Sequence, residues 1–424
     1  DIDKLSTNNY SRNSARSQLF NSLTSSIPRF SMGTKFQHEK LAKYILTNYN
    51  VITLNGVPHI YMNNGVFSGD STDIEKVIVQ LVPSAKILQI KEVLNTLRLT
   101  APARVETDYR YICFENCIVN IETLQTYEFN PKKFIFTSKL NIPYSTDIFT
   151  SKPASVEFVN NYFRDISCGD IEIAKLLLQV IAYCIIRTAK YQVGFCLHGE
   201  GSNGKSSYLH IIESLLGPYC SHESLGQLSN IRFSTSNLYS CTANIIDDEA
   251  QPKNIDTSLI KTIISGGSIS AERKGEQAFK FNPYATLIFA TNDCIDFKDS
   301  SLGMLRRFHI IPFNACFTKD RGNLNVNMTE QICQRDNLQI IAIMALRAFN
   351  EVIRTGTFSI PLSVLDATKS YFLESNNVQE FVTQSPIEWK VVKSEYYEEY
   401  TTWCTDNNKE PVSNSQFGKE VLHM

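Results

Sequence analysis

The stretch Gly199-Glu200-Gly201-Ser202-Asn203-Gly204-Lys205-Ser206-Ser207 decides how the rest of the chain is understood. It matches G-x-x-x-x-G-K-[ST], the pattern of a phosphate-binding loop. Backbone N–H groups of such a loop turn inward around phosphates, and the dipole of the following helix adds positive potential. The pattern predicts that Lys205 reaches the β- and γ-phosphates and that the Ser206 hydroxyl is a ligand of Mg²⁺. We therefore expect a nucleotide-binding site.

The residues on either side of the loop fit this interpretation. Before it, residues 193–197 form an apolar run that is typical of a buried strand. After it, apolar residues recur at helical spacing until Gly217-Pro218 ends the helix. These are Tyr208, Leu209, Ile211, Ile212, Leu215 and Leu216. A chance glycine-rich turn would not explain why a strand and a helix flank the pattern.

A second apolar strand, residues 242–246, ends in the three acids Asp247, Asp248 and Glu249. A nucleotide hydrolase needs one carboxylate to hold Mg²⁺ and one to orient and deprotonate the attacking water. We assign Asp248 to the metal and Glu249 to the general base, with Asp247 as the rival metal ligand. The alternative is a solvated acidic turn, which the position downstream of the loop disfavours.

Two later segments carry polar side chains beside apolar strands. Residues 284–292 read as a buried strand that ends at Asn292, whose amide we expect to contact the γ-phosphate or to position the water. Arg306 and Arg307 precede the apolar run 308–313. We favour Arg307, with Arg306 as the alternative, as an arginine finger that a neighbouring subunit supplies. Taken alone, these features would be a strand-end turn and a surface arginine pair.

Between the acids and Asn292 the sequence predicts a helix, a double-glycine turn and a hairpin. The hairpin carries Arg273-Lys274-Gly275 at its tip and returns through Phe279 and Phe281. A basic tip can project into the central hole of a ring and bind DNA phosphates without regard to base sequence. We therefore predict Arg273 and Lys274 as DNA ligands, although the tip alone would also suit a solvated hairpin.

Bulk composition limits the class of protein. The 424 residues are 43% hydrophobic and 20% charged, which is typical of a soluble globular chain with a sizeable core. A net charge of −2 excludes a globally cationic DNA-coating protein, so DNA contact must come from a local basic feature. The 11 cysteines are scattered and favour reduced thiols in a cytosolic protein. No apolar run approaches transmembrane length, so we expect no membrane partner.

We predict four regions along the chain. Residues 1–150 form an N-terminal α+β accessory domain with a loose arm at its start, and Asn55-Gly56 predicts a hairpin within it. Residues 151–189 are a helical lead-in, 190–315 are the nucleotide-binding core, and 316–424 are a helical region with a truncated winged-helix-like tail. Because the first residue is Asp1 and the last residues read as part of an element, we expect a piece of a longer chain.

The order of loop, acidic strand, basic hairpin, strand-end asparagine and arginine pair resembles a superfamily 3 helicase of the AAA+ class. The flanks, including residues 114–120, resemble the poxvirus and satellite-phage type of primase-helicase. The resemblance implies an α/β fold whose P-loop core is a parallel sheet flanked by helices. It also implies a homohexameric ring with ATP and Mg²⁺ at subunit interfaces, which moves along single-stranded DNA and unwinds forked DNA. This would take place in the replication of a virus, phage or mobile element, in the bacterial cytoplasm or at a viral replication site.

Carried onto this sequence, the resemblance gives each predicted residue the role stated above, with Asp247 and Asp248 both open for the metal. In the family, a primase lies upstream of the helicase. The present sequence contains no primase-like set of residues, so we expect that activity in a part of the protein outside it. The resemblance also allows other replication proteins as partners. One alternative is an ATP-dependent replication initiator or loader that binds DNA without unwinding it. A small-molecule kinase would leave the hairpin and the arginine pair unused.

Overall fold

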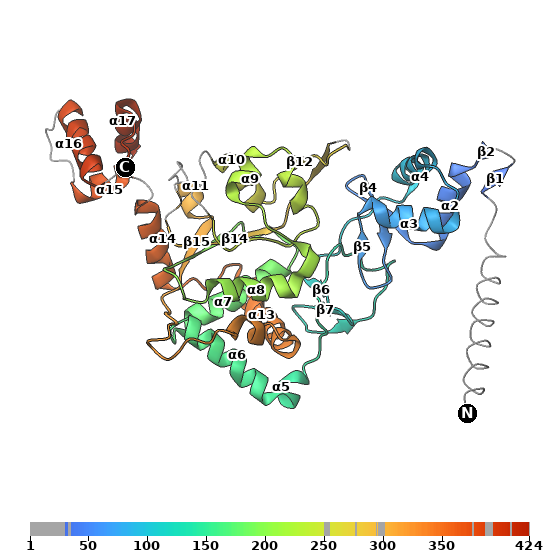
Figure 1. The fold of residues 1–424 in the computed structure, drawn as a ribbon, viewed down its shortest axis with the longest axis horizontal. Coiled ribbons are helices and arrows are strands. Elements are labelled where there is room, and N and C mark those ends of the chain that lie inside the picture. Colours follow the sequence, from blue (N-terminus) through green and yellow to red (C-terminus); the bar gives the residue numbers. More distant parts are fainter. Residues whose placement is uncertain are drawn as a thin grey trace. The chain divides into compact units, whose positions relative to one another are not determined.

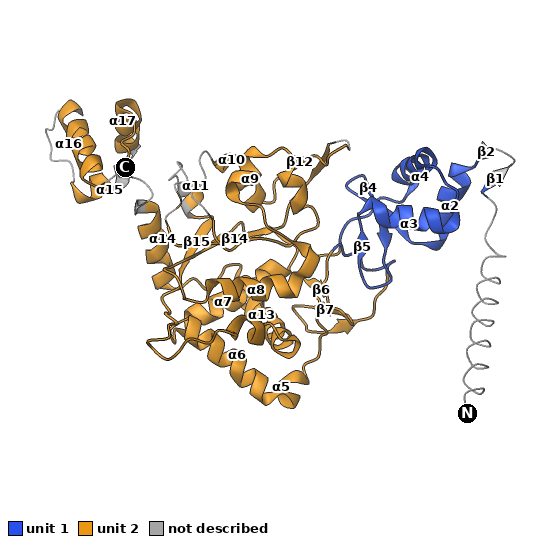
Figure 2. Cartoon of the chain, viewed as in Figure 1, with its two compact units in different colours: residues 1–106, 131–137 blue, residues 107–130, 138–424 orange. Residues whose placement is uncertain are grey.

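The computed structural model of the chain describes residues 30–32, 35–249, 255–275, 278–293, 295, 302–374, 377–385, 393–407 and 409–423. They fall into two compact units (Figure 2). The first contains residues up to 106 together with 131–137, and the second contains 107–130 together with 138–424. Residues 107–130 and 138–150 thus pack with the second unit, whereas the functional boundaries predicted at 150, 189 and 315 stay predictions.

The described part of the first unit combines helices with two small antiparallel sheets, one of two strands and one of three (Figure 1). Asn55 and Gly56 both have positive φ angles, of 50° and 78°, as a two-residue hairpin turn of the primed type requires. The predicted hairpin is therefore confirmed. Each helix buries one apolar stripe in a shared core, for example Leu41, Ile78 and Leu97. The elements are β1 (Ser31–Met32), β2 (Lys35–Phe36), α2 (His38–Asn48), β3 (Val51–Leu54), β4 (Val57–Tyr61), β5 (Phe67–Ser68), α3 (Ser71–Leu81) and α4 (Ile87–Thr100).

A five-stranded, all-parallel sheet is the centre of the second unit, in the order β10-β11-β14-β9-β15. Its strands are nearly continuous apolar runs because helices and loops cover both faces. The predicted α/β class with a parallel sheet and flanking helices is confirmed. The carboxyl ends of β9, β11 and β14 lie at one edge, since Ile246 pairs with Phe289 and Thr291 pairs with His198. The strands are β9 (Gly194–His198), β10 (Cys220–Ser221), β11 (Ala243–Ile246), β14 (Thr286–Thr291) and β15 (Phe308–Pro312).

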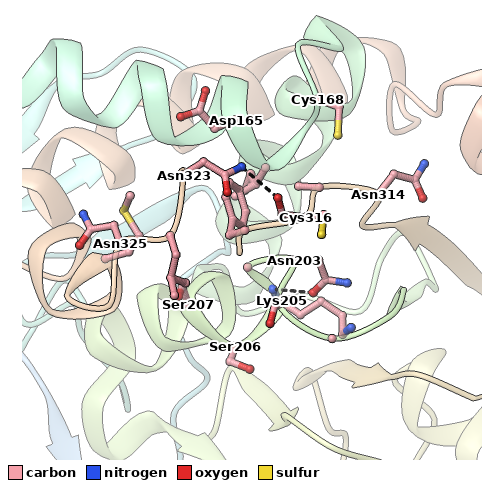
Figure 3. A pocket seen from close by; sticks show the side chains of 18 of the residues that line it. Asp165, Cys168, Asn203, Lys205, Ser206, Ser207, Asn314, Cys316, Asn323 and Asn325 are labelled. Atoms are coloured by element: carbon pink, nitrogen blue, oxygen red, sulfur yellow. Dashed lines mark hydrogen bonds between the residues drawn. The ribbon is translucent and has the colours of Figure 1, made fainter. Parts of the chain in front are cut away.

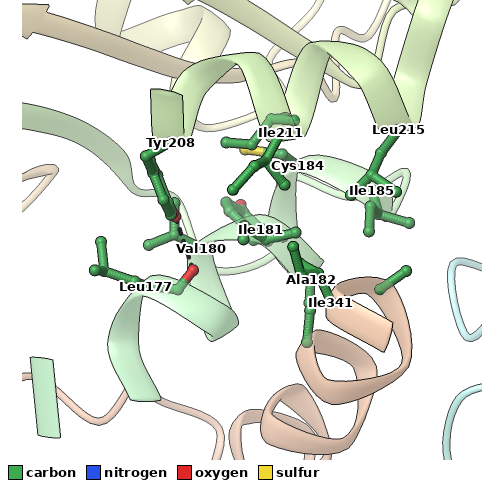
Figure 4. Packing of buried hydrophobic residues seen from close by; sticks show 14 of the residues in the cluster. Leu177, Val180, Ile181, Ala182, Cys184, Ile185, Tyr208, Ile211, Leu215 and Ile341 are labelled. Atoms are coloured by element: carbon green, nitrogen blue, oxygen red, sulfur yellow. Dashed lines mark hydrogen bonds between the residues drawn. The ribbon is translucent and has the colours of Figure 1, made fainter. Parts of the chain in front are cut away.

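Three helices stack beneath this sheet and form the largest core. Figure 4 shows side chains of α7 and α8 packed against each other, with Ile341 of α13 beside them. The Tyr208 hydroxyl of α8 donates to the Leu177 carbonyl of α7 at 2.7 Å. The predicted helical lead-in is two helices, because Cys168 and Gly169 have positive φ angles. The helices are α5 (Ile148–Ser151), α6 (Pro153–Ile166), α7 (Ile171–Ile185), α8 (Lys205–Leu216), α12 (Met328–Ile332) and α13 (Arg335–Thr355).

The predicted basic hairpin is confirmed as an antiparallel pair, β12 (Ile269–Ala271) with β13 (Phe279–Phe281). Residues 276–277 of its turn lie outside the described residues. A second small antiparallel sheet joins three strands near the start of this unit. The remaining elements here are β6 (Tyr111–Cys113), β7 (Ile118–Asn120), β8 (Thr126–Tyr127), η1 (Gly217–Tyr219), α9 (Leu225–Asn230), η2 (Ser234–Leu238), α10 (Thr257–Ile264) and α11 (Leu302–Leu305).

The C-terminal part of the second unit is helical. It contains α14 (Leu362–Glu374), α15 (Asn377–Gln384), α16 (Lys393–Asp406) and α17 (Asn414–His423). The last three share an aromatic core that includes Phe381, Tyr400 and Phe417. Within residues 377–385, 393–407 and 409–423 there is no strand, so the winged-helix-like tail stays a prediction. Among the described helices, none has the length and apolar character that crossing a bilayer requires.

Candidate functional site

The loop between β9 and α8 needs glycine at two positions. Gly204, which caps α8, has a φ of 91°, and a Cβ atom there would lie 3.1 Å from Cγ2 of Ile166. A Cβ atom on Gly199 would lie 2.5 Å from the carbonyl oxygen of Phe313. Other segments of the same chain thus pack against the loop backbone, and side chains at these two glycines would push those segments away. Both glycines of the pattern, Gly199 and Gly204, are therefore required by the close packing around the loop.

The loop lysine is buried and faces its own loop. Its Nζ donates to the Gly199 carbonyl, to the Glu200 carbonyl at 3.2 Å and to Oδ1 of Asn292 at 3.0 Å. Burial lowers the pKa of Lys205, and the nearby carboxylates of Asp247 and Asp248 oppose that shift. Three sequence-predicted features, the loop, the acids and the asparagine, therefore meet at one ammonium group. A phosphate oxygen would be a stronger partner for this ammonium than the carbonyl oxygens it contacts.

These groups line a cavity of about 930 Å³, within the size range of small-molecule and cofactor sites (Figure 3). One wall is the loop and the start of α8, including Ser206 and Ser207. A second wall is the end of α6 and the turn after it, with Asp165 and Cys168. A third wall comes from residues 314–325. The lining also includes Lys205, Asp247, Asp248 and Asn292.

The three acids do not share one environment. Asp247 and Asp248 line the cavity, whereas Glu249 is not among its lining residues. Glu249 is buried, and its two carboxylate oxygens accept from the Leu225 N–H of α9 at 3.2 and 3.1 Å. Burial raises the pKa of Glu249 to about 7; the Leu225 hydrogen bond opposes this rise, and the charge of Asp248 adds to it. To act as the general base, Glu249 would have to leave the Leu225 amide, so that assignment stays a prediction.

The two arginines lie at the opposite edge of the sheet from the cavity. The Arg307 carbonyl accepts from the Gly194 N–H at 2.7 Å, where β9 begins, whereas the loop follows the end of β9. Gly194 and His198, the two ends of β9, are four residues apart, which corresponds to roughly 13 Å along the strand. Neither arginine lines the cavity; Arg306 is exposed, and Nη1 of Arg307 donates to the Gly303 carbonyl at 2.7 Å. In this arrangement, neither arginine contacts the cavity of its own chain.

At the hairpin, the two predicted DNA ligands differ. Lys274 is exposed at the described end of the hairpin. Arg273 is half-buried, and its guanidinium carbon lies 5.5 Å from the ring centre of Tyr239 and 5.4 Å from that of Phe279. These cation–π contacts hold the Arg273 side chain against Tyr239 and Phe279. Lys274 is therefore the better-placed candidate for phosphate contact.

Beside the hairpin lies an exposed group that sequence reasoning missed. Ile231 and Phe233 are 50% and 37% exposed, and the guanidinium carbon of Arg232 lies 5.6 Å from the Phe233 ring centre. Arg232 also pairs with Glu272 of the hairpin at 2.9 Å. An arginine beside an exposed aromatic ring suits contact with nucleic acid bases and phosphates. The adjacent Ile-Arg-Phe at the end of a short helix is the only sequence signal for it.

The comparisons with known proteins match two segments of the chain. Residues 39–168 match the family model described as "D5 N terminal like", and residues 197–307 match a family of unknown function, DUF5906. Over 171 residues the chain is 24% identical to the "Putative helicase L207/L206" of Acanthamoeba polyphaga mimivirus. That match covers 38% of this chain and 17% of the viral protein, so the chain spans a small part of that relative's length.

Solved structures with a similar arrangement include two apo structures of the C-terminal region of NrS-1. Each has a TM-score of 0.48 and 14% sequence identity, over 85% of this chain and 84% or 85% of the other.

Proposed function

We propose that this chain is the helicase part of a primase-helicase, an ATP-driven motor of the superfamily 3 AAA+ class that unwinds DNA in the replication of a virus, phage or mobile element. One observation carries the proposal. The Nζ of Lys205 bonds to Asn292 in a nucleotide-sized cavity that Asp247 and Asp248 also line. The likeness to a viral protein named as a helicase, and the exposed Lys274 on the hairpin, support DNA as the partner.

The cavity residues suit a nucleoside triphosphate and Mg²⁺. Lys205 and the loop amides would bind the β- and γ-phosphates, and Ser206 would hold the metal together with one acid. Mg²⁺, when bound, neutralises charge on the transferring phosphoryl group. Since Glu249 is turned toward Leu225, we propose Asp247 for the metal and Asp248 for orienting the water. Asn292 would contact the γ-phosphate.

The position of the arginine pair supports a ring. Because Arg307 lies at the far edge of the sheet from its own cavity, its guanidinium would serve the nucleotide of the neighbouring subunit. We propose a homohexamer in which the hairpins face a central channel. There, Lys274 would bind the phosphates of single-stranded DNA, which gives affinity independent of base sequence.

Replacing the hairpin lysine tests the proposal. We expect Lys274→Ala to keep basal ATP hydrolysis and to lose DNA stimulation and strand displacement on a forked duplex, because the cavity is untouched and the phosphate contact is removed. Lys43→Ala, an exposed lysine of α2, is the matched control and should behave like the unchanged protein. Normal displacement by Lys274→Ala would refute the hairpin's role. Hydrolysis and DNA binding with no displacement by the unchanged protein would favour an initiator or loader.

A further inference from the structure

The third wall of the cavity belongs to a segment, residues 313–325, that is hydrogen-bonded to the phosphate-binding loop and to the strand before it. The Phe313 N–H donates to the His198 carbonyl at 2.8 Å, and Nδ2 of Asn203 donates to the Phe313 carbonyl at 3.1 Å. Further along, the Phe317 N–H donates to the Ser202 carbonyl at 2.8 Å. We call this segment the strap. Because three hydrogen bonds join it to the loop region, the strap and the loop form one structural piece.

The far end of the strap is closed by the side chain of Asn323. Its Oδ1 accepts from the Thr318 N–H at 3.0 Å. Its Nδ2 donates to the Cys316 carbonyl at 2.9 Å, a bond that Figure 3 marks. Within the closed segment, the Gly322 N–H donates to the Lys319 carbonyl at 2.9 Å, and Gly322 has a φ of 67°. One amide therefore fixes a tight turn, and Arg321 lies in that turn.

Arg321 lines the cavity and is exposed. Its neighbours in the turn, Lys319 and Asp320, are not among the lining residues. Within the described part of the chain, the Arg321 guanidinium has no hydrogen bond or ion pair.

The other cationic groups that line the cavity already have contacts. Arg164 bonds to the adjacent Asp165 at 3.4 Å, and Lys205 contacts loop carbonyls near Asp247 and Asp248. A magnesium–nucleoside triphosphate complex keeps a net negative charge. A guanidinium binds two phosphate oxygens at once through its planar fork, which makes it the best-suited side chain for that charge.

We infer that Arg321 binds the phosphates of the nucleotide held by its own subunit, and that Asn323 is the residue that positions it. This inference rests on the proposed nucleotide site. It assigns two arginines to one site from different chains: Arg321 in the same subunit and Arg307 from the neighbour. The strap brings its arginine to the phosphates without closure of a subunit interface.

The first test measures the affinity for a fluorescent, non-hydrolysable ATP analogue and the steady-state hydrolysis of ATP. Arg321→Gln should weaken binding about 10- to 100-fold, as loss of a charge-assisted bidentate contact does. Lys319→Gln, in the same turn, should leave binding unchanged. Equal binding by Arg321→Gln and the unchanged protein would overturn the inference. Failure of the unchanged protein to bind any nucleotide would instead overturn the proposed function.

Mixing of variants tests whether Arg321 acts within its own subunit. In a mixture of Arg321→Gln and Lys205→Ala subunits, no subunit has both groups, so hydrolysis should stay at the level of the separate variants. If Arg321 served a neighbouring cavity, the intact lysine of one subunit would meet the intact arginine of the next. Recovery of hydrolysis in this mixture would therefore contradict the inference.

A double-mutant cycle tests the role of Asn323. Asn323→Ala should weaken analogue binding when Arg321 is present and should add no further loss in the Arg321→Gln background, because the positioned group is gone. Thermal melting checks that each variant folds. Additive losses would show that Asn323 supports the cavity without acting through Arg321.

Discussion

At the scale of single residues, the polar groups around the Lys205 ammonium come from separate segments of the chain. Lys205, Asp248 and Asn292 follow the ends of three parallel strands, and such ends meet at one edge of a sheet. The position of Glu249 could not be predicted, because it depends on the Leu225 amide of a six-residue helix with no strong pattern. Arg321 could not be predicted for a similar reason, because a turn closed by the Asn323 side chain has no periodic sequence pattern.

The contrast between the acids makes a prediction about turnover. Asp248→Asn should reduce ATP hydrolysis by at least about 100-fold with nucleotide binding retained, because it removes a carboxylate that lines the cavity. Glu249→Gln should cost less than about tenfold, since its carboxylate faces Leu225. Steady-state hydrolysis and analogue binding measure both effects. An equal or larger loss in Glu249→Gln would return the general-base role to Glu249.

The raised pKa of Glu249 makes a second prediction, about stability. The carboxyl of Glu249 has a pKa of about 7 in the folded chain and its ordinary value of 4.5 when unfolded. The stabilising contribution of the retained proton is therefore full below the unfolded value and is lost as pH rises through about 7. Glu249→Gln avoids this loss, so its melting temperature should rise relative to the unchanged protein from pH 5 to pH 8. A pH-independent difference would contradict the buried position.

At the scale of elements, periodicity predicts what is regular. The apolar spacing of residues 208–216 predicts α8, and the apolar runs before the acids and before Asn292 predict β11 and β14. The strap and the exposed Ile231–Phe233 group are irregular, and their roles depend on hydrogen bonds to distant residues. Sequence spacing carries no signal for such contacts, so they appear only in the folded chain.

The junction of the loop and α8 gives a prediction at this scale. Gly204→Ala should destabilise the fold by about 1–2 kcal/mol, because alanine at a φ of 91° is strained and its Cβ would press on Ile166. Nucleotide binding should fall with it. Gly201→Ala is the matched control, since a Cβ there meets no atom within 4 Å. Chemical denaturation measures both. A Gly204→Ala variant as stable as Gly201→Ala would contradict the described loop geometry.

At the scale of the whole molecule, the proposed function requires more than one subunit. The cavity and the arginine pair lie at opposite edges of one parallel sheet, so a single chain does not bring Arg307 to its own cavity. The sequence suggested a shared site only through the order of its motifs. The positions of the two edges supply a physical reason for it. The proposed homohexamer depends on contacts between chains, which neither sequence spacing nor the structure of a single chain shows.

The most direct measurement mixes Arg307→Ala subunits with Lys205→Ala subunits and follows ATP hydrolysis against the mixing ratio. Each variant alone should be inactive, because one lacks the finger and the other lacks the loop lysine. In the mixture, an intact lysine in one chain can meet an intact Arg307 from its neighbour. We predict recovered hydrolysis with a maximum at intermediate ratios. Absence of recovery at every ratio, or a protein that stays monomeric with nucleotide and DNA present, would contradict the account.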